Sequence, residues 1–282
     1  MLEFIKMHGL GNDYVYMDAI NQSIKNRNEL AKKVSDRHFG IGADGLILIC
    51  DSDICDFKMR MFNADGSEAE MCGNGIRCVG KYVYDHKLTD KKNITVETLA
   101  GVKVLELFDE NGYVEKVKVD MGRPIFDNKD IAIDNKDVLK KFTIKVLDRD
   151  FNVTYVSMGN PHAIIVVDDL DNFDVDKYGS IIEKDEHFPN GTNVEFVEIK
   201  SRKDLKMRVY ERGSGETMAC GTGACASVVA CKVNGLVDED VKVELRGGDL
   251  DIDYDKDDSH VYMSGGATTV FETKIELKLK RD

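Results

Sequence analysis

The sequence predicts an α/β protein of the α+β type, made of two pseudo-symmetric domains that each wrap a mostly antiparallel sheet around a central helix. Three observations lead to this fold class. A Cys-Gly-x-Gly turn occurs twice, a helical spacing of apolar residues follows each copy, and alternating strand patterns follow each helix. Self-similarity at one fixed offset is the mark of a duplicated structural unit.

The two turns read "EMCGNGIRC" (70–78) and "MACGTGAC" (218–225), and 220 minus 72 gives an offset of 148. The same offset relates "GLGNDY" to "SMGNPH", and it lays "MFNADGSEAEMCGNG" (61–75) over "VYERGSGETMACGTG" (209–223) without a gap. The match is less regular near residues 38–45, because His38 corresponds to His187 at an offset of 149 rather than 148. The sequence alone therefore leaves open whether Asp44 or Gly45 corresponds to Asn193.

The central helices are predicted to begin directly after the two cysteines. Apolar residues then recur at spacings of three or four, and they are Ile76, Val79 and Val83 in the first copy and Ala224, Val228 and Val229 in the second. Residues 94–122 and 241–266 alternate like strands joined by tight turns, at an offset near 147.

The domain boundary is predicted at "MGRPIFD" (121–127), where a proline follows a glycine. Residues 268–280, "TTVFETKIELKLK", alternate Ile275, Leu277 and Leu279 with lysines, as a half-buried edge strand does. We expect this strand to return to the first half. The N-terminal domain then comprises residues 1–121 and 267–282, and the C-terminal domain residues 122–266.

Composition excludes several classes of protein. A formal charge of -13 over 282 residues opposes nucleic-acid binding, and no apolar run reaches the roughly 18 residues that span a bilayer. Without a secretory segment we expect a cytoplasmic protein, whose seven cysteines, an odd number, stay reduced. Because no C-x-x-C pair or local His pair is present, no metal site is predicted.

The chemistry of a duplicated Cys-Gly turn follows from the start of a helix. Backbone N–H groups there lack partners within the helix and attract anions, while glycines let a ligand approach closely. A helix start also lowers the pKa of a cysteine placed on it, so we expect Cys72 and Cys220 to carry thiol pKa values shifted toward neutrality.

Suppose both helix starts point at one bound carboxylate in a cleft between the domains. The two thiols then flank the adjacent carbon, so that a thiolate removes a proton from one face while a thiol delivers one to the other. This arrangement predicts a two-base racemase or epimerase of an amino acid, with no cofactor.

Other readings of the cysteines remain open. Cys78, Cys225 and Cys231 fall inside the helical patterns and are interpreted as core residues, while Cys50 and Cys55 show no chemistry. Even Cys72 and Cys220 could serve packing alone, in a protein that binds an amino acid without reacting with it. A thiol redox protein would instead require a local C-x-x-C pair.

Five motifs together resemble the diaminopimelate epimerase family: "MHGLGNDY", "RHFGIGADG", "FNADGSEAEMCGNG", "SMGNPH" and "RVYERGSGETMACGTGACA". The resemblance spans nearly the whole chain. It implies interconversion of LL- and meso-2,6-diaminopimelate for lysine and peptidoglycan synthesis, without pyridoxal phosphate or metal, by Cys72 and Cys220.

The resemblance also assigns the other site residues. It gives the reacting carboxylate to Gly73, Asn74, Gly221 and Thr222, and the distal end of the substrate to Asn12, Asn63, Asn160, Asn193 and Arg212. His162 and Glu211 match family residues that bias thiol ionisation and meet the substrate ammonium. Gly45 departs from members that carry a glutamine there, and it is left out of the site.

Proline racemases and hydroxyproline epimerases are the nearest rival families, but their pattern would require a histidine in place of Asn74. Arg212 has no basic counterpart in the first half, where Ala64 stands, and this favours a substrate with one distinct charged end. The sequence leaves open which thiol is the resting base, how far the cleft closes and whether the protein is a homodimer.

Overall fold

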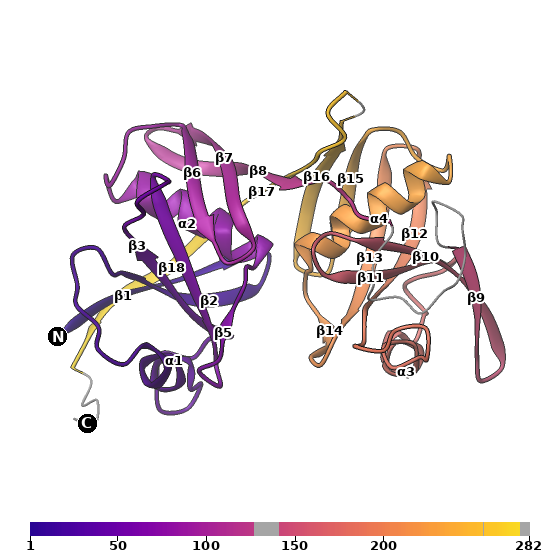
Figure 1. Ribbon diagram of the computed structural model, residues 1–282, viewed down its shortest axis with the longest axis horizontal. Helices are drawn as coiled ribbons and strands as arrows, with labels where there is room; N and C mark the ends of the chain where they lie inside the picture. The colour runs from indigo at the N-terminus through magenta and orange to yellow at the C-terminus, as the bar shows by residue number, and fades with distance from the viewer. Residues whose placement is uncertain (127–140, 256, 277–282) are drawn as a thin grey trace. The chain divides into compact units, whose positions relative to one another are not determined.

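The computed structural model describes residues 1–126, 141–255 and 257–276, and the chain divides into two compact units (Figure 1). Unit 1 comprises Met1–Val119 and Gly265–Asp282, and unit 2 comprises Asp120–Ser264. The sequence placed the two domain boundaries after residues 121 and 266. In the structure the units divide after residues 119 and 264, two residues earlier in each case. The chain thus leaves unit 1 once and returns to it for its last strand.

The elements of unit 1 follow the predicted order of strands around a Cys-Gly turn and its helix. They are β1 (Leu2–Gly9), β2 (Asn12–Asp18), α1 (Arg27–Ser35), β3 (Gly45–Cys50), β4 (Phe57–Asn63), β5 (Glu68–Ala69), α2 (Gly73–Asp85), β6 (Asn93–Thr98), β7 (Gly101–Glu110), β8 (Tyr113–Gly122), which runs across the boundary, and β18 (Thr268–Ile275).

Unit 2 repeats this plan. Its elements are β9 (Lys141–Val146), β10 (Arg149–Ser157), β11 (Pro161–Val166), α3 (Val175–Ile182), β12 (Asn193–Ser201), β13 (Asp204–Glu211), β14 (Gly215–Thr217), α4 (Gly221–Val233), β15 (Asp240–Leu245), β16 (Gly248–Tyr254) and β17 (Val261–Gly265), which ends at the boundary.

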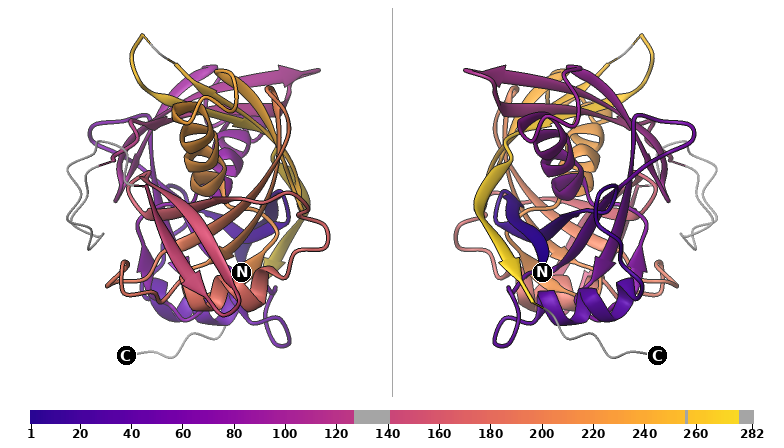
Figure 2. Two further views of the ribbon diagram at one scale, coloured as in Figure 1. Left: turned by 90° about the vertical axis from the view of Figure 1, so that its right-hand side faces the viewer. Right: turned by 90° about the vertical axis from the view of Figure 1, so that its left-hand side faces the viewer.

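Each unit holds one long helix inside a curved, mostly antiparallel sheet, as the sequence predicted. Figure 2 shows α4 in the left view and α2 in the right view, with strands around each. Residues 73–83 of α2 are all buried, and α4 is buried from residue 223 to residue 231. A helix buried on every side needs apolar or small residues all around, which "GTGACASVVACKV" provides.

The strand registers settle the correspondence that the sequence left open. In unit 1 Tyr14 on β2 pairs with Gly45 on β3, and in unit 2 His162 on β11 pairs with Asn193 on β12, both in parallel. His162 follows Tyr14 by 148 residues, and Asn193 follows Gly45 by the same number. Gly45, and not Asp44, therefore corresponds to Asn193. A Cβ at Gly45 would lie 2.2 Å from the carbonyl oxygen of Phe62, which explains the glycine there.

Strand β3 of unit 1 and its equivalent in unit 2, β12, each have two buried faces. On β3, Leu46 and Leu48 pack into the core beneath α1, whereas Ile47 points at α2, where it approaches Gly75. A parallel strand covered on both sides reads as the continuous apolar run "GLILIC". The equivalent strand β12 places Phe196 in the core with α3 and Glu195 against Gly223 of α4.

The last strand completes unit 1. β18 runs antiparallel to β1, with Leu2 opposite Ile275 and His8 opposite Thr268. This is the return to the first half that the alternating pattern predicted, whereas Leu277 and Leu279 lie outside the described residues.

Candidate active site

Both Cys-Gly turns are helix starts with the same geometry. Cys72 is the N-cap of α2, and its sulfur accepts a hydrogen bond from the N–H of Gly75 at 3.4 Å. Cys220 is the N-cap of α4, and its sulfur accepts from the N–H of Gly223 at 3.4 Å. A thiol here takes the place of the Ser, Thr, Asp or Asn that usually caps a helix, so each sulfur lies at the positive end of a helix dipole.

In unit 1, Cys72 contacts the first residue of β2. Its thiol donates to Oδ1 of Asn12 at 3.3 Å, and Nδ2 of Asn12 donates to Oδ2 of Asp44 at 2.9 Å. Arg37 in turn binds Asp44 at 2.9 Å. Burial raises the pKa of Asp44, and the charge of neighbouring Asp13 raises it further.

Asn74 is oriented by a buried arginine that sequence analysis missed. Arg77 is fully buried on α2 and donates to Oδ1 of Asn74 at 2.9 Å and to the carbonyl oxygen of Gly73 at 3.1 Å. The carbonyl of Gly266 accepts from the same guanidinium at 3.2 Å. The orientation of the Asn74 side chain is thus set by a residue one helical turn further along α2.

Asn63 lies at the same edge of the sheet as Asn12. β2 and β3 begin there and β4 ends there, since Gly45 pairs with both Tyr14 and Asn63. The Asn63 amide donates to Oγ of Ser67 at 3.0 Å. Unit 1 therefore gathers Asn12, Asn63 and the start of α2 in one region.

In unit 2, the thiol of Cys220 is more buried and more strongly perturbed than the sequence predicted. Burial raises its pKa well above the ordinary value, and the negative charges of Glu211 and Glu195 raise it further. Hydrogen bonds from Thr222 and from the N–H of Gly223 lower the pKa but do not outweigh burial. The expectation of a thiol pKa near neutrality is thus wrong for Cys220, because two carboxylates and desolvation outweigh the helix start.

A chain of side-chain contacts leads away from Cys220. Its sulfur lies 3.4 Å from Oγ1 of Thr222, which accepts from Nδ2 of Asn160 at 3.3 Å. Oδ1 of Asn160 lies 3.1 Å from Nε2 of His162. The other ring nitrogen of His162, Nδ1, lies 2.7 Å from Oε1 of Glu195.

Asn193, Glu211 and Arg212 form the second cluster of unit 2. Oδ1 of Asn193 accepts from the backbone N–H of Arg212 at 3.1 Å, and Nδ2 donates to the carbonyl of Pro161 at 3.0 Å. Oε1 of Glu211 accepts from the hydroxyl of Thr217 at 2.5 Å. The Arg212 guanidinium is exposed and donates to the carbonyl of Asn190 at 3.3 Å.

Asn12 thus contacts the helix-start thiol of unit 1, while Asn160, Thr222 and Glu211 lie close to that of unit 2. The sequence patterns did not single out Glu195 or Arg77, and they left Asp44 as one of two candidates for the counterpart of Asn193. The signal for Glu195 was present, since it is a lone acid among apolar residues in "NVEFV" and corresponds to Ile47 at the 148 offset. A strand glutamate is usually solvated, but Glu195 is fully buried.

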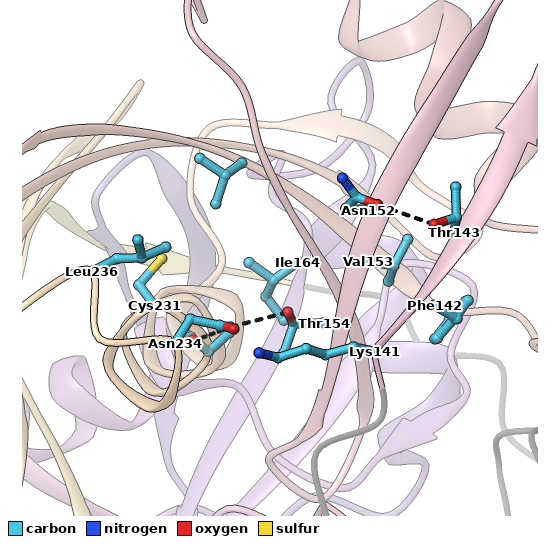
Figure 3. Close-up of a pocket in the computed structure, with 12 residues that line it drawn as sticks. Lys141, Phe142, Thr143, Asn152, Val153, Thr154, Ile164, Cys231, Asn234 and Leu236 are labelled. Carbon is cyan, nitrogen blue, oxygen red and sulfur yellow. Dashed lines mark hydrogen bonds between the residues drawn. The ribbon is translucent and has the colours of Figure 1, made fainter. Parts of the chain in front are cut away.

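A separate cavity of about 480 Å³ opens in unit 2 beside β9, β10 and the C-terminal end of α4 (Figure 3). Cys231 and Asn234 line it, and Asn234 donates to Thr154 at 3.2 Å. Ten residues separate Cys231 from Gly221, which places the cavity roughly 15 Å along the helix from the thiol of Cys220. None of the predicted site residues lines this cavity.

Among the described residues, no group of three or more His, Cys, Asp or Glu side chains is arranged to hold a metal ion. No helix in the described ranges is long and apolar enough to cross a membrane. All seven cysteines lie within those ranges as free thiols.

Comparison with known proteins identifies the family. The profile of diaminopimelate epimerase matches residues 4–126 and 154–270, on both sides of the unit boundary. The chain belongs to the diaminopimelate epimerase family. It is therefore an isomerase, and the resemblance drawn from the five motifs is confirmed.

Two relatives show how close the diaminopimelate epimerase match is. The chain is 58% identical to the diaminopimelate epimerase of Methanococcus maripaludis strain S2, over 98% of this chain and 100% of that protein. It is 53% identical to the diaminopimelate epimerase of Acetivibrio thermocellus, over 98% and 99%.

Solved structures of more distant proteins share the fold. A phenazine biosynthesis protein of the PhzF family from Bacillus anthracis superposes with a TM-score of 0.71 at 21% identity, over 98% of this chain and 99% of that one. A probable proline racemase from Agrobacterium radiobacter, solved with bound carbonate, superposes with a TM-score of 0.68 at 14% identity, over 99% of this chain and 94% of that one. These likenesses confirm the fold of two similar units around central helices.

Proposed function

We propose that this chain interconverts LL- and meso-2,6-diaminopimelate by passing protons through Cys72 and Cys220, without a cofactor or a metal. The observation that carries the proposal is the closely similar N-cap geometry of the two cysteines, on helices that start at the same point of the repeat. Family membership supports the substrate.

The chemical step needs one thiolate and one thiol. The thiolate takes the α-proton, the Cα–H bond breaks, and its electron pair stays on the carbon as a carbanion stabilised by the adjacent carboxylate. The opposite thiol then gives its proton to the other face of the carbon. The stereocentre is inverted, and the two sulfurs have exchanged protonation states.

The two helix starts suit this step because negative charge moves onto the substrate carboxylate as the proton leaves. N–H groups and the dipole at the start of a helix stabilise that charge without having to rearrange. We propose that both starts face one substrate, with Gly73, Asn74, Gly221 and Thr222 around the reacting carboxylate.

The distal end of the substrate requires different groups, because it carries a second carboxylate and a second ammonium. Arg212 offers a planar guanidinium for the carboxylate. Among the remaining predicted contacts, Asn12, Asn63, Asn160 and Asn193 are neutral amides able to donate or accept, and Glu211 is an acid suited to an ammonium.

The test is a chiral assay in D2O with LL-diaminopimelate, using proline and trans-4-hydroxyproline as controls. We expect meso product that carries deuterium at the inverted α-carbon, because the donor thiol exchanges with solvent. Cys72→Ala and Cys220→Ala should each abolish inversion, while Cys231→Ala, which changes a buried cysteine of α4 away from the cap, should remain active.

Two results would contradict the proposal. Turnover of proline or hydroxyproline but not of diaminopimelate would favour the rival substrate class, and full activity in either cap variant would exclude the two-thiol mechanism. We also propose that the protein works in the cytoplasm, and fractionation of cells tests this. Analytical ultracentrifugation tests for a homodimer.

A further inference from the structure

One face of β2 is directed at the start of α2. Alternate residues of a strand share a face, so Asn12, Tyr14 and Tyr16 lie on the same side of β2. The thiol of Cys72 donates to Oδ1 of Asn12 at 3.3 Å. The hydroxyl of Tyr16 donates to the carbonyl of Gly75 at 3.1 Å. Tyr14 lies between these two contacts and is buried, so its side chain faces the same turn of helix.

The ring of Tyr14 fits against the sheet because its strand partner is a glycine. Tyr14 pairs with Gly45 on β3, and its Cε1 lies 3.0 Å from where a Cβ on Gly45 would be. The hydroxyl at the end of the ring lies within hydrogen-bonding reach of both Asn12 and Cys72. A glycine on the neighbouring strand thus makes room for a large side chain whose polar end reaches the thiol.

The neighbours of Tyr14 determine which way its hydrogen points. Nδ2 of Asn12 donates one hydrogen to Oδ2 of Asp44 at 2.9 Å, and the second hydrogen of the same amide is available to the tyrosine oxygen. A hydroxyl has a single hydrogen. With its oxygen accepting from Asn12, Tyr14 directs that hydrogen to the sulfur of Cys72.

The surroundings of Tyr14 also keep its hydroxyl protonated. Burial raises the pKa of Tyr14 well above its usual range, and the negative charges of Cys72 and Asp44 raise it further. A cysteine ionises at lower pH than such a tyrosine. The hydroxyl therefore remains a donor throughout the pH range in which the neighbouring thiol titrates.

The thiol of the second unit has a hydroxyl neighbour of different origin. The sulfur of Cys220 lies 3.4 Å from Oγ1 of Thr222 on its own helix. At the 148 offset the counterpart of Thr222 is Asn74, whose amide is held by Arg77. The helix start of unit 1 therefore carries no hydroxyl at this position, and β2 supplies one from Tyr14.

We propose that Tyr14 is a positioning residue that stabilises the thiolate of Cys72 by donating a hydrogen bond to it. The contact with Asn12 favours the thiol form, because an amide oxygen only accepts. The N–H of Gly75 and the hydroxyl of Tyr14 can both donate to the thiolate. Because the thiolate is the form in which Cys72 takes the α-proton, this inference rests on the proposed function.

The first test removes the hydroxyl alone, as Tyr14→Phe. The ring beside Gly45 is kept, so the fold should be retained. We expect kcat/KM for diaminopimelate at neutral pH to fall about 10-fold, near the lower end of what a hydrogen bond to a charged group contributes. The loss should be equal for the LL and meso substrates, since the equilibrium constant of the reaction fixes the ratio of the two values.

Tyr16→Phe is the matched control. It removes a buried hydroxyl from the same face of β2, but one that donates to the carbonyl of Gly75 and not to the sulfur. This variant should keep its kcat/KM. Full kcat/KM in Tyr14→Phe, or an equal loss in Tyr16→Phe, would overturn the proposal.

The second test does not depend on turnover. Cys72 is partly exposed, and iodoacetamide alkylates only the thiolate. Trypsin releases Cys72 in a peptide, residues 61–77, that holds no other cysteine, so mass spectrometry follows its alkylation alone. In Tyr14→Phe the pH of half-maximal alkylation rate should rise by about one unit, which is the same tenfold change in the thiolate population.

The same control applies to the alkylation profile. Tyr16→Phe should leave the midpoint of Cys72 in place, and an unchanged midpoint in Tyr14→Phe would overturn the proposal. If Tyr14→Phe does not fold, Tyr14→Met fills a similar space without a donor, and the same shift is expected of it.

These readouts separate the two ideas. A protein that never epimerises diaminopimelate would refute the proposed function, and the alkylation profile of Cys72 would still decide the role of Tyr14. An active enzyme whose kcat/KM and alkylation profile ignore the Tyr14 hydroxyl would refute only the positioning role.

Discussion

At the scale of single residues, the two cysteines have equivalent backbones but different surroundings. Cys72 donates to the neutral amide of Asn12, whereas the thiol of Cys220 lies near Glu195 and Glu211. The repeat in the sequence was sufficient to locate both thiols. It could not give the raised pKa of Cys220, because burial, which is the largest cause, and the nearby charges of Glu211 and Glu195 arise only when the strands fold against α4.

Arg212 provides a test of substrate recognition. Arg212→Ala should raise KM for diaminopimelate about 10- to 100-fold, since hydrogen bonds to charged groups contribute roughly 1.5 to 3 kcal/mol. The guanidinium is exposed, so the fold should be unaffected. Steady-state kinetics against Arg212→Lys, which keeps the charge but loses the planar fork, measure the effect, and unchanged KM in both variants would remove Arg212 from the site.

Cys78 provides a test of stability against pH. Burial raises the pKa of this thiol to about 11, from an ordinary value of 9.0. Between these values the unfolded chain ionises and the folded protein does not, so the free energy of unfolding should fall as pH rises from about 9 to 11, by about 2 to 3 kcal/mol for this group.

Urea denaturation at several pH values measures that loss. Cys78→Ala removes the ionisable group, so its free energy of unfolding should decline less steeply over the same window. Below pH 9 the thiol is neutral in both states, and the two curves should run parallel. Equal slopes above pH 9 would show that Cys78 does not carry the effect.

At the scale of elements, one ion pair recurs at the 148 offset. Arg60 on β4 binds Glu68 on β5 through two contacts of 2.7 and 2.8 Å, and Arg208 on β13 binds Glu216 on β14 through contacts of 2.7 and 2.9 Å. Each pair closes the turn that leads into a cysteine. The overlay in the sequence aligned Glu68 with Glu216 but began one residue after the two arginines. Neither pairing was predicted, because spacing alone does not show that two strands turn back on each other.

The two ion pairs should differ in strength. Arg208 also donates to the carbonyls of Leu170 and Phe173, at 3.0 and 2.9 Å. We expect Arg208→Ala to destabilise the protein by about 2 to 4 kcal/mol and Arg60→Ala by about 1 kcal/mol or less, because carbonyls left unpaired add to the loss of the pair. Urea denaturation compares them, and the reverse order would contradict the assignment.

The sequence anticipated some elements better than others. The long helices could be placed because a Cys-Gly start and apolar spacing agree, and the strands after them because alternation is regular. The short helices α1 and α3 were not predicted. Helices of nine and eight residues show little periodicity in the sequence, and packing on the cores beneath them stabilises them in the fold.

At the scale of the whole molecule, duplication has been followed by divergence at a few positions. Tyr14 and His162 occupy equivalent positions in the two units, and so do Ile47 and Glu195. The fold could be predicted because both copies preserve the same pattern of apolar residues. The differences between the copies, which the pattern does not encode, distinguish the two thiols.

Oxidation tests whether both cysteines face one substrate. If they do, a mild oxidant should inactivate the empty enzyme by joining Cys72 to Cys220, reductant should restore it, and bound diaminopimelate should protect it. Peptide mapping identifies the bond. A crosslink that instead involves Cys78, Cys225 or Cys231 would contradict the shared site.

The pairing of β18 with β1 has a consequence for synthesis on the ribosome. Leu2 is synthesised before unit 2 and Ile275 after it, yet they are opposite one another in the sheet. Unit 2, whose chain is continuous, can complete its folding while the open edge of β1 still waits for a partner. The domain that is translated first is therefore finished last, and its unpaired strand is the part of the nascent chain most in need of protection from aggregation.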